Sequence, residues 1–146
     1  MIFERVESKN HLYEAILVAF LDDTLLINKY HVNIGSLVEC VNDTYRKIMD
    51  ADNIYPLEWY VVHDGIETIG YCITSKTYSF LYSFGINIKH RTSENMINWF
   101  ENVKGLFIGS FTCGLWAKND RAIDYLVRNG MNVYDRNELE IHLKYN

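Results

Sequence analysis

The sequence lacks an excess of basic residues. Its 14 lysines and arginines stand against 19 aspartates and glutamates, which gives a formal net charge of −5. A surface that binds nucleic acid needs clustered cations to neutralise the phosphates. The lysines and arginines are instead scattered along the chain, so we expect no nucleic-acid partner.

Cysteine is also scarce. The three residues, Cys40, Cys72 and Cys113, are widely spaced and form no CxxC pair. This argues against a disulfide framework and against a cysteine-based zinc site, and Cys72 and Cys113 are predicted to be small core residues. The five histidines show neither HxH nor HExxH spacing, so we expect no metal site.

Long apolar runs and nucleotide-binding loops are missing as well. No run approaches the roughly 20 residues of a membrane-spanning helix, and Glu4 and Glu7 interrupt any apolar core of a signal peptide. We therefore expect an intracellular, soluble chain that has no membrane partner and is not secreted by a signal peptide. The absence of GxSxG and P-loop motifs leaves hydrolase and NTPase functions unsupported.

The chain does contain enough apolar material for a core. Hydrophobic residues make up 49% and aromatic residues 14% of the 146 residues, a length typical of one domain, 1–146. The single proline, Pro56, separates a helical first third from a strand-rich remainder.

Two segments before the proline have helical spacing. Ser8 predicts the start of a helix that runs to about Phe20, and Asn33 predicts the start of a second helix that ends near Asp50. The apolar stripe of the second helix comprises Ile34, Leu37, Val38, Val41, Tyr45 and Ile48.

After the proline the apolar period becomes two. Residues 57–74 predict two strands joined by Asp64-Gly65, a strong hairpin signal. Residues 79–90 predict a strand whose single apolar face comprises Phe80, Tyr82, Phe84, Ile86 and Ile88.

The last third alternates helices and strands. A helix is predicted from Thr92 or Ser93 to about Lys104, ended by Gly105, and a strand over 106–117 follows. Asn119 is predicted to cap a last helix that ends at Gly130, with its inner face formed by Ile123, Leu126 and Val127. Residues 131–145 predict a final strand or short hairpin. This order indicates an α/β, three-layer domain in which a mixed, mostly antiparallel sheet is flanked by helices.

This layout, over about residues 55–134, resembles the GNAT acyltransferase fold. The closest local match is 119–131, NDRAIDYLVRNGM, which looks like the late helix of that family. The resemblance implies acetyl-CoA as cofactor and, if CoA binds, Ile88, Arg91 and Asn119 as its cofactor-binding residues. It also implies a V-shaped gap between the strands beside Ile88 and Leu115, which admits the pantetheine arm in family enzymes.

The phosphate-binding segment departs from the family. The resemblance implies Arg or Gln, two residues, Gly, one residue, then Gly or Ala, whereas residues 91–96 read RTSENM. Arg91 is in place, but Glu94 and Met96 replace the small residues. A carboxylate in the first turn satisfies the helix dipole and repels pyrophosphate, by roughly 1 to 4 kcal/mol for like charges about 4 Å apart.

The late helix departs as well. Leu126 stands where the resemblance places the tyrosine that protonates the departing thiolate. Tyr125 lies one residue earlier, about 100° around the helix, and so cannot simply substitute for it.

These departures are similar to those of small GNAT-like proteins of short-tailed bacteriophages. We therefore expect a degenerate member without catalytic residues, cofactor or metal. The resemblance implies a virion-associated or accessory protein whose partners are other proteins, such as phage structural proteins or a second copy of itself. It would be made in the host cytoplasm, with the virion as a second location.

Two alternatives stay open: an active acetyl-CoA-dependent N-acyltransferase on an unknown amine, and a regulatory domain that binds CoA without chemistry. In an active enzyme His90 could serve as a general base, although a surface histidine is the simpler interpretation. Glu58 and Glu67 are expected on the solvent side of their strands. Asn119 could be only a helix cap, and Arg91 only an ion-paired side chain.

Aromatic residues are concentrated between positions 80 and 116. Most are expected in the core, but any that face outward would form an apolar patch suited to a protein partner. They are Phe80, Tyr82, Phe84, Trp99, Phe100, Phe107, Phe111 and Trp116.

Overall fold

The computed structural model describes residues 1–30 and 36–146. The strands are β1 (Ile2–Val6), β2 (Glu58–His63), β3 (Thr68–Ser75), β4 (Phe80–Ile86), β5 (Phe111–Trp116), β6 (Asn132–Arg136) and β7 (Glu140–Tyr145). The helices are α1 (Lys9–Phe20), α2 (Leu37–Asp52), α3 (Ser93–Leu106) and α4 (Asp120–Arg128), with a short π-helix η1 (Leu26–Tyr30) and a 3₁₀ turn η2 (Ile88–His90).

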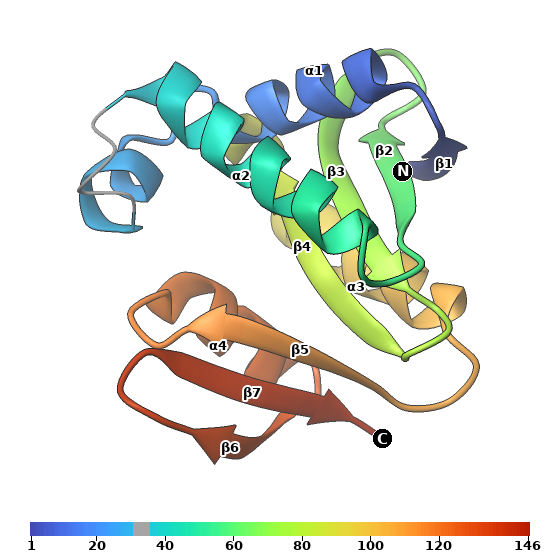
Figure 1. Cartoon of the computed structure of the whole chain (residues 1–146), viewed down its shortest axis with the longest axis vertical. Coiled ribbons are helices and arrows are strands. Elements are labelled where there is room, and N and C mark those ends of the chain that lie inside the picture. The colour runs from blue at the N-terminus through green and yellow to red at the C-terminus, as the bar shows by residue number, and fades with distance from the viewer. Residues whose placement is uncertain (31–35) are drawn as a thin grey trace.

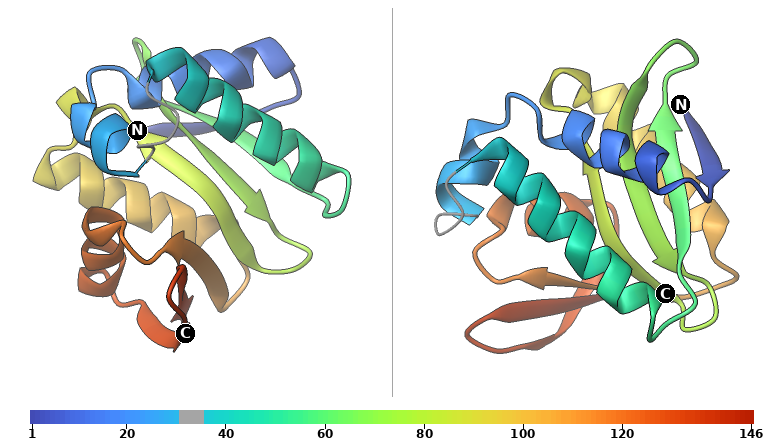
Figure 2. Two further views of the ribbon diagram at one scale, coloured as in Figure 1. Left: turned by 60° about the vertical axis from the view of Figure 1, so that its left-hand side comes forward. Right: turned by 45° about the horizontal axis from the view of Figure 1, so that its top comes forward.

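The strands in the described part of the chain form one seven-stranded sheet in the order β1-β2-β3-β4-β5-β7-β6 (Figure 1). Neighbouring strands are antiparallel except β4 and β5, which are parallel. Figure 2 shows α1 and α2 on one side of β2–β4, and α3 and α4 on the other. The predicted α/β class, a mostly antiparallel sheet flanked by helices, is confirmed.

The sheet separates the two apolar clusters found among the described residues. One lies beneath α1 and α2 and includes Leu12, Ile16, Val41, Ile48, Tyr71 and Ile73. The other lies beneath α3 and α4 and includes Leu81, Trp99, Phe100, Phe111, Leu126 and Leu143. Burying each such side chain stabilises the fold by roughly 1.5–3 kcal/mol. Within residues 1–30 and 36–146, no helix is long and apolar enough to cross a membrane.

Serine caps fix the starts of the first two helices. Ser8 Oγ accepts a hydrogen bond from the His11 N–H at 3.3 Å, as predicted, and Ser36 Oγ accepts one from the Glu39 N–H at 3.2 Å. Each bond satisfies a backbone donor that has no partner within its own helix.

The start predicted for the second helix is only partly testable. Asn33 and Ile34 lie outside the described residues, and the described helix begins at Leu37. The prediction that Val38 belongs to the buried stripe is wrong, because Val38 is exposed. It lies about 200° around the helix from the buried Cys40.

The strand β4 changes faces midway along its length. In its pairing with β3, Leu81 lies opposite Thr74 and Ser83 lies opposite the preceding residue, Ile73. Tyr82 therefore has no partner in β3 and forms a β-bulge. Phe80 and Tyr82 therefore pack beneath α1 and α2, whereas Phe84 packs beneath α3. The bulge makes the predicted single face of Phe80, Tyr82, Phe84, Ile86 and Ile88 wrong, and Ile88 lies beyond the strand in η2.

The two glycine helix ends behave differently. Gly130 ends α4 as predicted, with a left-handed φ of 102°. Gly105 does not end α3, which continues to Leu106, and the turn before β5 is made by Gly109 with a φ of 84°. Because this turn takes up residues 107–110, the strand predicted over 106–117 begins only at Phe111.

Further outcomes concern strands and side chains. The sequence did not predict the strand β1, while the hairpin option for the C-terminus is confirmed by β6 and β7. Val127 was predicted to face inward but is exposed, whereas Leu126 is buried. Of the eight clustered aromatics, Trp99, Phe100, Phe107 and Phe111 are buried and the others partly buried, so they supply core rather than an external patch.

Candidate functional site

The parallel strands β4 and β5 separate as they run. They pair only at Phe80 with Thr112 and at Leu81 with Cys113, and they diverge toward their carboxyl ends (Figure 1). We call this divergent region the fork. In α/β sheets a ligand site forms where neighbouring strands part at their carboxyl ends, so the fork is the first place to look for one.

A cavity of about 620 Å³ lies in the fork. This volume is within the range of small-molecule sites, which are mostly apolar with a few convergent polar groups. Residues from β4, β5, α3 and α4 line it, among them Tyr82, Gly85, Trp99, Gly114, Trp116 and Tyr125. The V-shaped gap that the resemblance implies is therefore present.

Two of the three predicted cofactor-binding residues line this cavity. Arg91 and Asn119 are among the lining residues, whereas Ile88 is not. Ile88 lies in η2 and is exposed. Asn119 is the N-cap of α4, and its Oδ1 accepts a hydrogen bond from the Ala122 N–H at 3.4 Å. Its side-chain oxygen therefore serves the helix cap.

A buried carboxylate, not predicted from the sequence, joins the two arms of the fork. Asp23 is 0% exposed, and its Oδ2 accepts hydrogen bonds from Arg91 Nη2 at 2.8 Å and Arg121 Nη2 at 2.9 Å. Its Oδ1 accepts bonds from the Leu26 N–H at 3.1 Å and from Arg121 at 3.3 Å. We call this arrangement of Asp23, Arg91 and Arg121 the Asp23 clamp.

The clamp spans the open end of the fork. Arg91 follows β4 in the chain, and Arg121 lies in the first turn of α4, which follows β5. The Nε of Arg91 also donates to the carbonyl of Ile86, the last residue of β4, at 2.9 Å. The guanidinium suggested for a cofactor phosphate is therefore held by contacts within the chain.

Asp23 is charged at neutral pH. Burial alone would raise its pKa, but the hydrogen bonds from Arg121 and Arg91 outweigh it and lower the pKa below the ordinary 3.8. A buried carboxylate with two charge-assisted partners and one backbone donor has its lone pairs well satisfied.

The start of α3 is capped by one of the chain's own side chains. Thr92 Oγ1 accepts a hydrogen bond from the Asn95 N–H at 3.2 Å, and Glu94 lies in the first turn. Asn95 Nδ2 donates to the His90 carbonyl at 2.8 Å. The bulky Met96 lines the cavity, and the Glu94 carboxylate in the first turn offsets the positive end of the helix dipole, which makes this helix end less favourable to an anion.

Leu126, at the position where the resemblance places a proton-donating tyrosine, is buried in the core. Tyr125 lines the cavity, and its hydroxyl donates to the Met96 carbonyl at 2.5 Å. Burial raises the pKa of Tyr125 well above its ordinary value, and both effects disfavour proton donation to a ligand.

A smaller hollow of about 320 Å³ adjoins the cavity and carries further polar side chains. It shares Tyr82 and Trp116 with the cavity and adds Glu140 and His142. His142 Nε2 lies 3.1 Å from Glu140 Oε2, a carboxylate–imidazole pair that can act as a general base. Lys47 Nζ lies 5.0 Å from the centre of the Trp116 ring, a cation–π contact.

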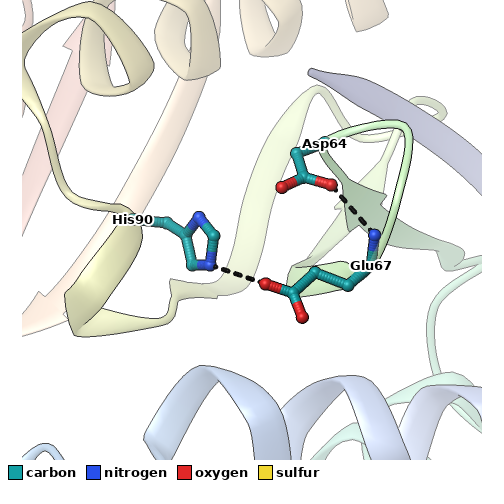
Figure 3. A group of neighbouring side chains, drawn as sticks. All are labelled: Asp64, Glu67 and His90. Carbon is teal, nitrogen blue, oxygen red and sulfur yellow. Dashed lines mark hydrogen bonds and ion pairs between the residues drawn. The ribbon is translucent and has the colours of Figure 1, made fainter.

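A second cluster lies outside the cavity, between the β2–β3 turn and η2. Asp64, Glu67 and His90 each bring a ligand atom within 4.8 Å of the others, and Figure 3 shows the three side chains turned toward one another. His90 Nε2 lies 3.2 Å from Glu67 Oε1, and Asp64 Oδ1 accepts from the Glu67 N–H at 2.9 Å. The three side chains offer oxygen and nitrogen ligands of the kind that bind a divalent ion. The ion pair and the hydrogen bond among them also explain why they lie together. Motif spacing could not reveal the cluster, because the fold brings its two segments together.

The two glutamates of the hairpin have different surroundings. Glu67 is exposed, as expected. The prediction that Glu58 faces solvent is wrong: it is buried, and its Oε1 accepts from Thr74 Oγ1 at 3.0 Å and from the Lys76 N–H at 2.7 Å. These two donors compensate the carboxylate for its loss of water.

Comparison with known proteins identifies the fold. No protein-family model matches the sequence, and no curated protein matches it. An acetyltransferase from Thermus thermophilus is similar in structure, with 14% identity and a TM-score of 0.68 over 99% of this chain and 96% of that one. The apo form of YjaB from Escherichia coli has 15% identity and a TM-score of 0.66 over 99% and 98% of the chains.

A third similar structure is the N-acetyltransferase PseH of Campylobacter jejuni in complex with acetyl coenzyme A. It has 12% identity and a TM-score of 0.57 over 99% of this chain and 97% of that one. At such identities the likeness concerns the fold alone, and it confirms a GNAT fold.

Proposed function

We propose that this chain is a non-catalytic protein of GNAT fold that acts through contacts with other proteins. The observation that carries the proposal is the Asp23 clamp. Arg91 and Arg121 both line the cavity, and both are bound to the chain's own buried carboxylate. A charged ligand entering at this end would have to displace a contact that is already charge-assisted on both sides.

Acetyl-CoA, the cofactor implied by the fold, fits one end of the site and not the other. The cavity of about 620 Å³ between the arms of the fork suits a narrow, mostly apolar arm. The phosphate end does not suit its ligand, because Glu94 lies in the first turn of α3 and Arg91 is held by Asp23 and Ile86. Excess negative charge would be placed next to the cofactor's own phosphates.

The lack of a side chain placed to protonate a leaving thiolate supports the same proposal. With Leu126 in the core and the Tyr125 hydroxyl bonded to the Met96 carbonyl, neither residue is set to protonate a leaving thiolate. Such proton transfers contribute typically 10²–10⁴-fold to a rate.

A surface patch next to the end of the fork where β4 and β5 are paired suits a protein contact. Ile54, Tyr55 and Tyr78 are exposed, and Tyr55 packs edge-on against Tyr78 and Phe80, with ring centroids 5.6 and 5.4 Å apart. Exposed aromatic residues that pack together are enriched in protein interfaces. We propose this patch as the contact surface for phage structural proteins or for a second copy, and a virion-associated or accessory role for the protein.

Calorimetry with acetyl-CoA tests the central claim. The expected result is no binding in the micromolar range, whereas PseH, whose structure contains acetyl coenzyme A, provides the positive control. Micromolar binding by this chain would overturn the proposal. The virion role is tested separately by the neighbouring genes, since portal, tail or capsid genes on either side would favour it.

An active N-acyltransferase is the second candidate, and the open fork favours it. The cavity lies between the two strands, and the His142–Glu140 pair lies beside it. This alternative predicts that thiol release from acetyl-CoA in the presence of some amine falls in His142→Gln, while the thermal midpoint is unchanged. No turnover with any amine tested would count against it, and binding without turnover would indicate a CoA-binding regulatory domain.

A further inference from the structure

We infer that Asp64, Glu67 and His90 form a binding site for a divalent transition-metal ion such as Zn²⁺, which joins the β2–β3 turn to η2. The two carboxylates come from the turn and the imidazole comes from η2. Each side chain brings one ligand atom within 4.8 Å of the other two, and the three converge from two segments of the chain (Figure 3). The set therefore supplies two oxygen ligands and one nitrogen ligand to a single point.

The spacing of the ligand atoms suits a tetrahedral ion. At metal–ligand distances of about 2.0–2.1 Å, two ligands of a tetrahedral zinc ion lie about 3.3 Å apart. His90 Nε2 and Glu67 Oε1 are already 3.2 Å apart. The Asp64 oxygen lies within 4.8 Å of both atoms, so it has to approach them by no more than about 1.5 Å. Rotation of this exposed side chain achieves that without a change in the backbone.

Hydrogen bonds within the chain already hold both segments in place. Asp64 Oδ1 accepts hydrogen bonds from the N–H groups of Ile66 and Glu67, both at 2.9 Å. The Asn87 N–H donates to the Ile69 carbonyl at 2.7 Å, which ties the segment that enters η2 to the start of β3. Hydrogen bonds of this kind orient the ligands of metal sites. The ion therefore has to order side chains only.

The charges around the site also favour a cation. Two carboxylates and a neutral imidazole place two negative charges in a small region. Among residues 1–30 and 36–146, neither carboxylate forms an ion pair with a lysine or an arginine, and Lys89, next to His90 in the sequence, pairs with Asp22 at 3.5 Å. A divalent ion neutralises the two carboxylates. The imidazole nitrogen selects Zn²⁺, Ni²⁺ or Cu²⁺ over Mg²⁺ and Ca²⁺, which prefer oxygen ligands.

The site goes beyond the proposed function, because its three residues do not line the cavity and do not depend on whether the chain binds acetyl-CoA. It also revises the expectation of no metal site, which rested on histidine spacing within single segments. Asp64 and Glu67 are exposed and His90 is partly buried. An ion therefore enters directly from solvent, and water completes its coordination.

The direct test is calorimetric titration of the full chain with Zn²⁺ in a buffer without chelators. We expect one equivalent to bind in the micromolar range. Asp64→Asn keeps the Oδ1 acceptor of the turn and removes the charged ligand, while His90→Gln removes the nitrogen ligand. Each substitution should weaken Zn²⁺ binding by about tenfold or more.

The chain offers a closely matched control in the ion pair of His63 and Glu4. Its Nε2–Oε2 distance is also 3.2 Å, and its side chains are 25% and 63% exposed, against 25% and 64% for His90 and Glu67. Among the described residues this pair belongs to no group of three metal-ligating side chains. His63→Gln should therefore bind Zn²⁺ as tightly as the unmodified chain does.

Thermal unfolding supplies a second measurement. Zn²⁺ at about 100 times its Kd should raise the thermal midpoint of the unmodified chain and of His63→Gln by several degrees, and a chelator should reverse the rise. The rise should be much smaller in Asp64→Asn and in His90→Gln. The inference is wrong if the unmodified chain binds no Zn²⁺ at micromolar concentrations, if the affinity survives both substitutions, or if His63→Gln weakens it as much as His90→Gln does. Equally tight binding of Mg²⁺ would also contradict it.

Discussion

The two ends of the β4–β5 pair are held together by different forces. At the closed end, Leu81 and Cys113 are paired through the backbone and buried in the core beneath α3 and α4. At the open end the strands no longer pair, and the ionic contacts of the Asp23 clamp connect the segments that follow them. Packing and backbone hydrogen bonds thus maintain the fold at one end, while ionic contacts between side chains connect the segments at the other.

The largest loss of stability is expected at the closed end. Phe111, the first residue of β5, is 1% exposed and packs against Phe100, Phe107 and Tyr145. Phe111→Ala should lower the free energy of unfolding by about 3–5 kcal/mol, because it removes a buried ring and leaves a cavity. Urea unfolding measures the loss, which should be nearly independent of salt and pH. A strong salt dependence would show that the two ends are not distinct.

A somewhat smaller loss is expected at the open end. Asp23→Ala leaves two arginines without their shared carboxylate, and removing one partner of a buried ion pair costs about 3 kcal/mol. The control Asp22→Asn, at an exposed position whose left-handed φ of 63° an asparagine also tolerates, should change the free energy of unfolding by less than about 0.5 kcal/mol. Equal losses in the two variants, measured by urea unfolding, would mean that the clamp does not hold the fork.

The pH dependence of stability should also separate the two ends. Burial would raise the folded pKa of Asp23, but the hydrogen bonds from Arg121 and Arg91 overcome it and leave the pKa lowered. Its contribution is therefore complete above the ordinary value of 3.8 and is lost as pH falls below that value toward the folded pKa. The thermal midpoint should fall below about pH 4, and less steeply in Asp23→Asn than in Phe111→Leu. Identical slopes would contradict this assignment. Asp43 and Asp64, whose pKa values are also lowered, account for a remaining slope.

The smallest effect is expected at Asn119, which caps α4 and also lines the cavity. Asn119→Ala removes an N-cap with a 3.4 Å hydrogen bond and should cost about 1 kcal/mol or less. Asn119→Ser, which keeps a capping oxygen, should restore most of it in thermal unfolding. A variant that keeps its stability yet loses thiol release from acetyl-CoA would instead favour the acyltransferase alternative.

The local features of the fold were predictable because short-range rules determine them. Ser8, Thr92 and Asn119 mark helix starts through bonds to residues three positions away, and Asp64-Gly65 marks the hairpin. The strand β1 carries no clear alternation, since charged residues interrupt its few apolar ones. The bulge at Tyr82 also escaped prediction, because it depends on the pairing with β3.

The candidate site was predictable only in part. Arg91 and Asn119 were found because a family pattern places them, and both line the cavity. Asp23 was missed, because its partners Arg91 and Arg121 lie 68 and 98 positions away in the sequence. The one local sign was a pair of aspartates within the apolar stretch FLDDTLL, where a buried acid needs a distant cation.

Because of the bulge in β4, the deletion of a single residue from this strand would disturb both apolar cores. Removing Tyr82 alone would restore strict alternation and exchange the sides of the residues on one part of the strand relative to the other. Phe84 would then move away from Trp99, whose ring centroid is now 4.8 Å distant, while Gly85 would lose its close approach to α1. Substitutions at this position should therefore be tolerated far better than a deletion, and a deletion scan along β4 would reveal the bulge as its most sensitive point.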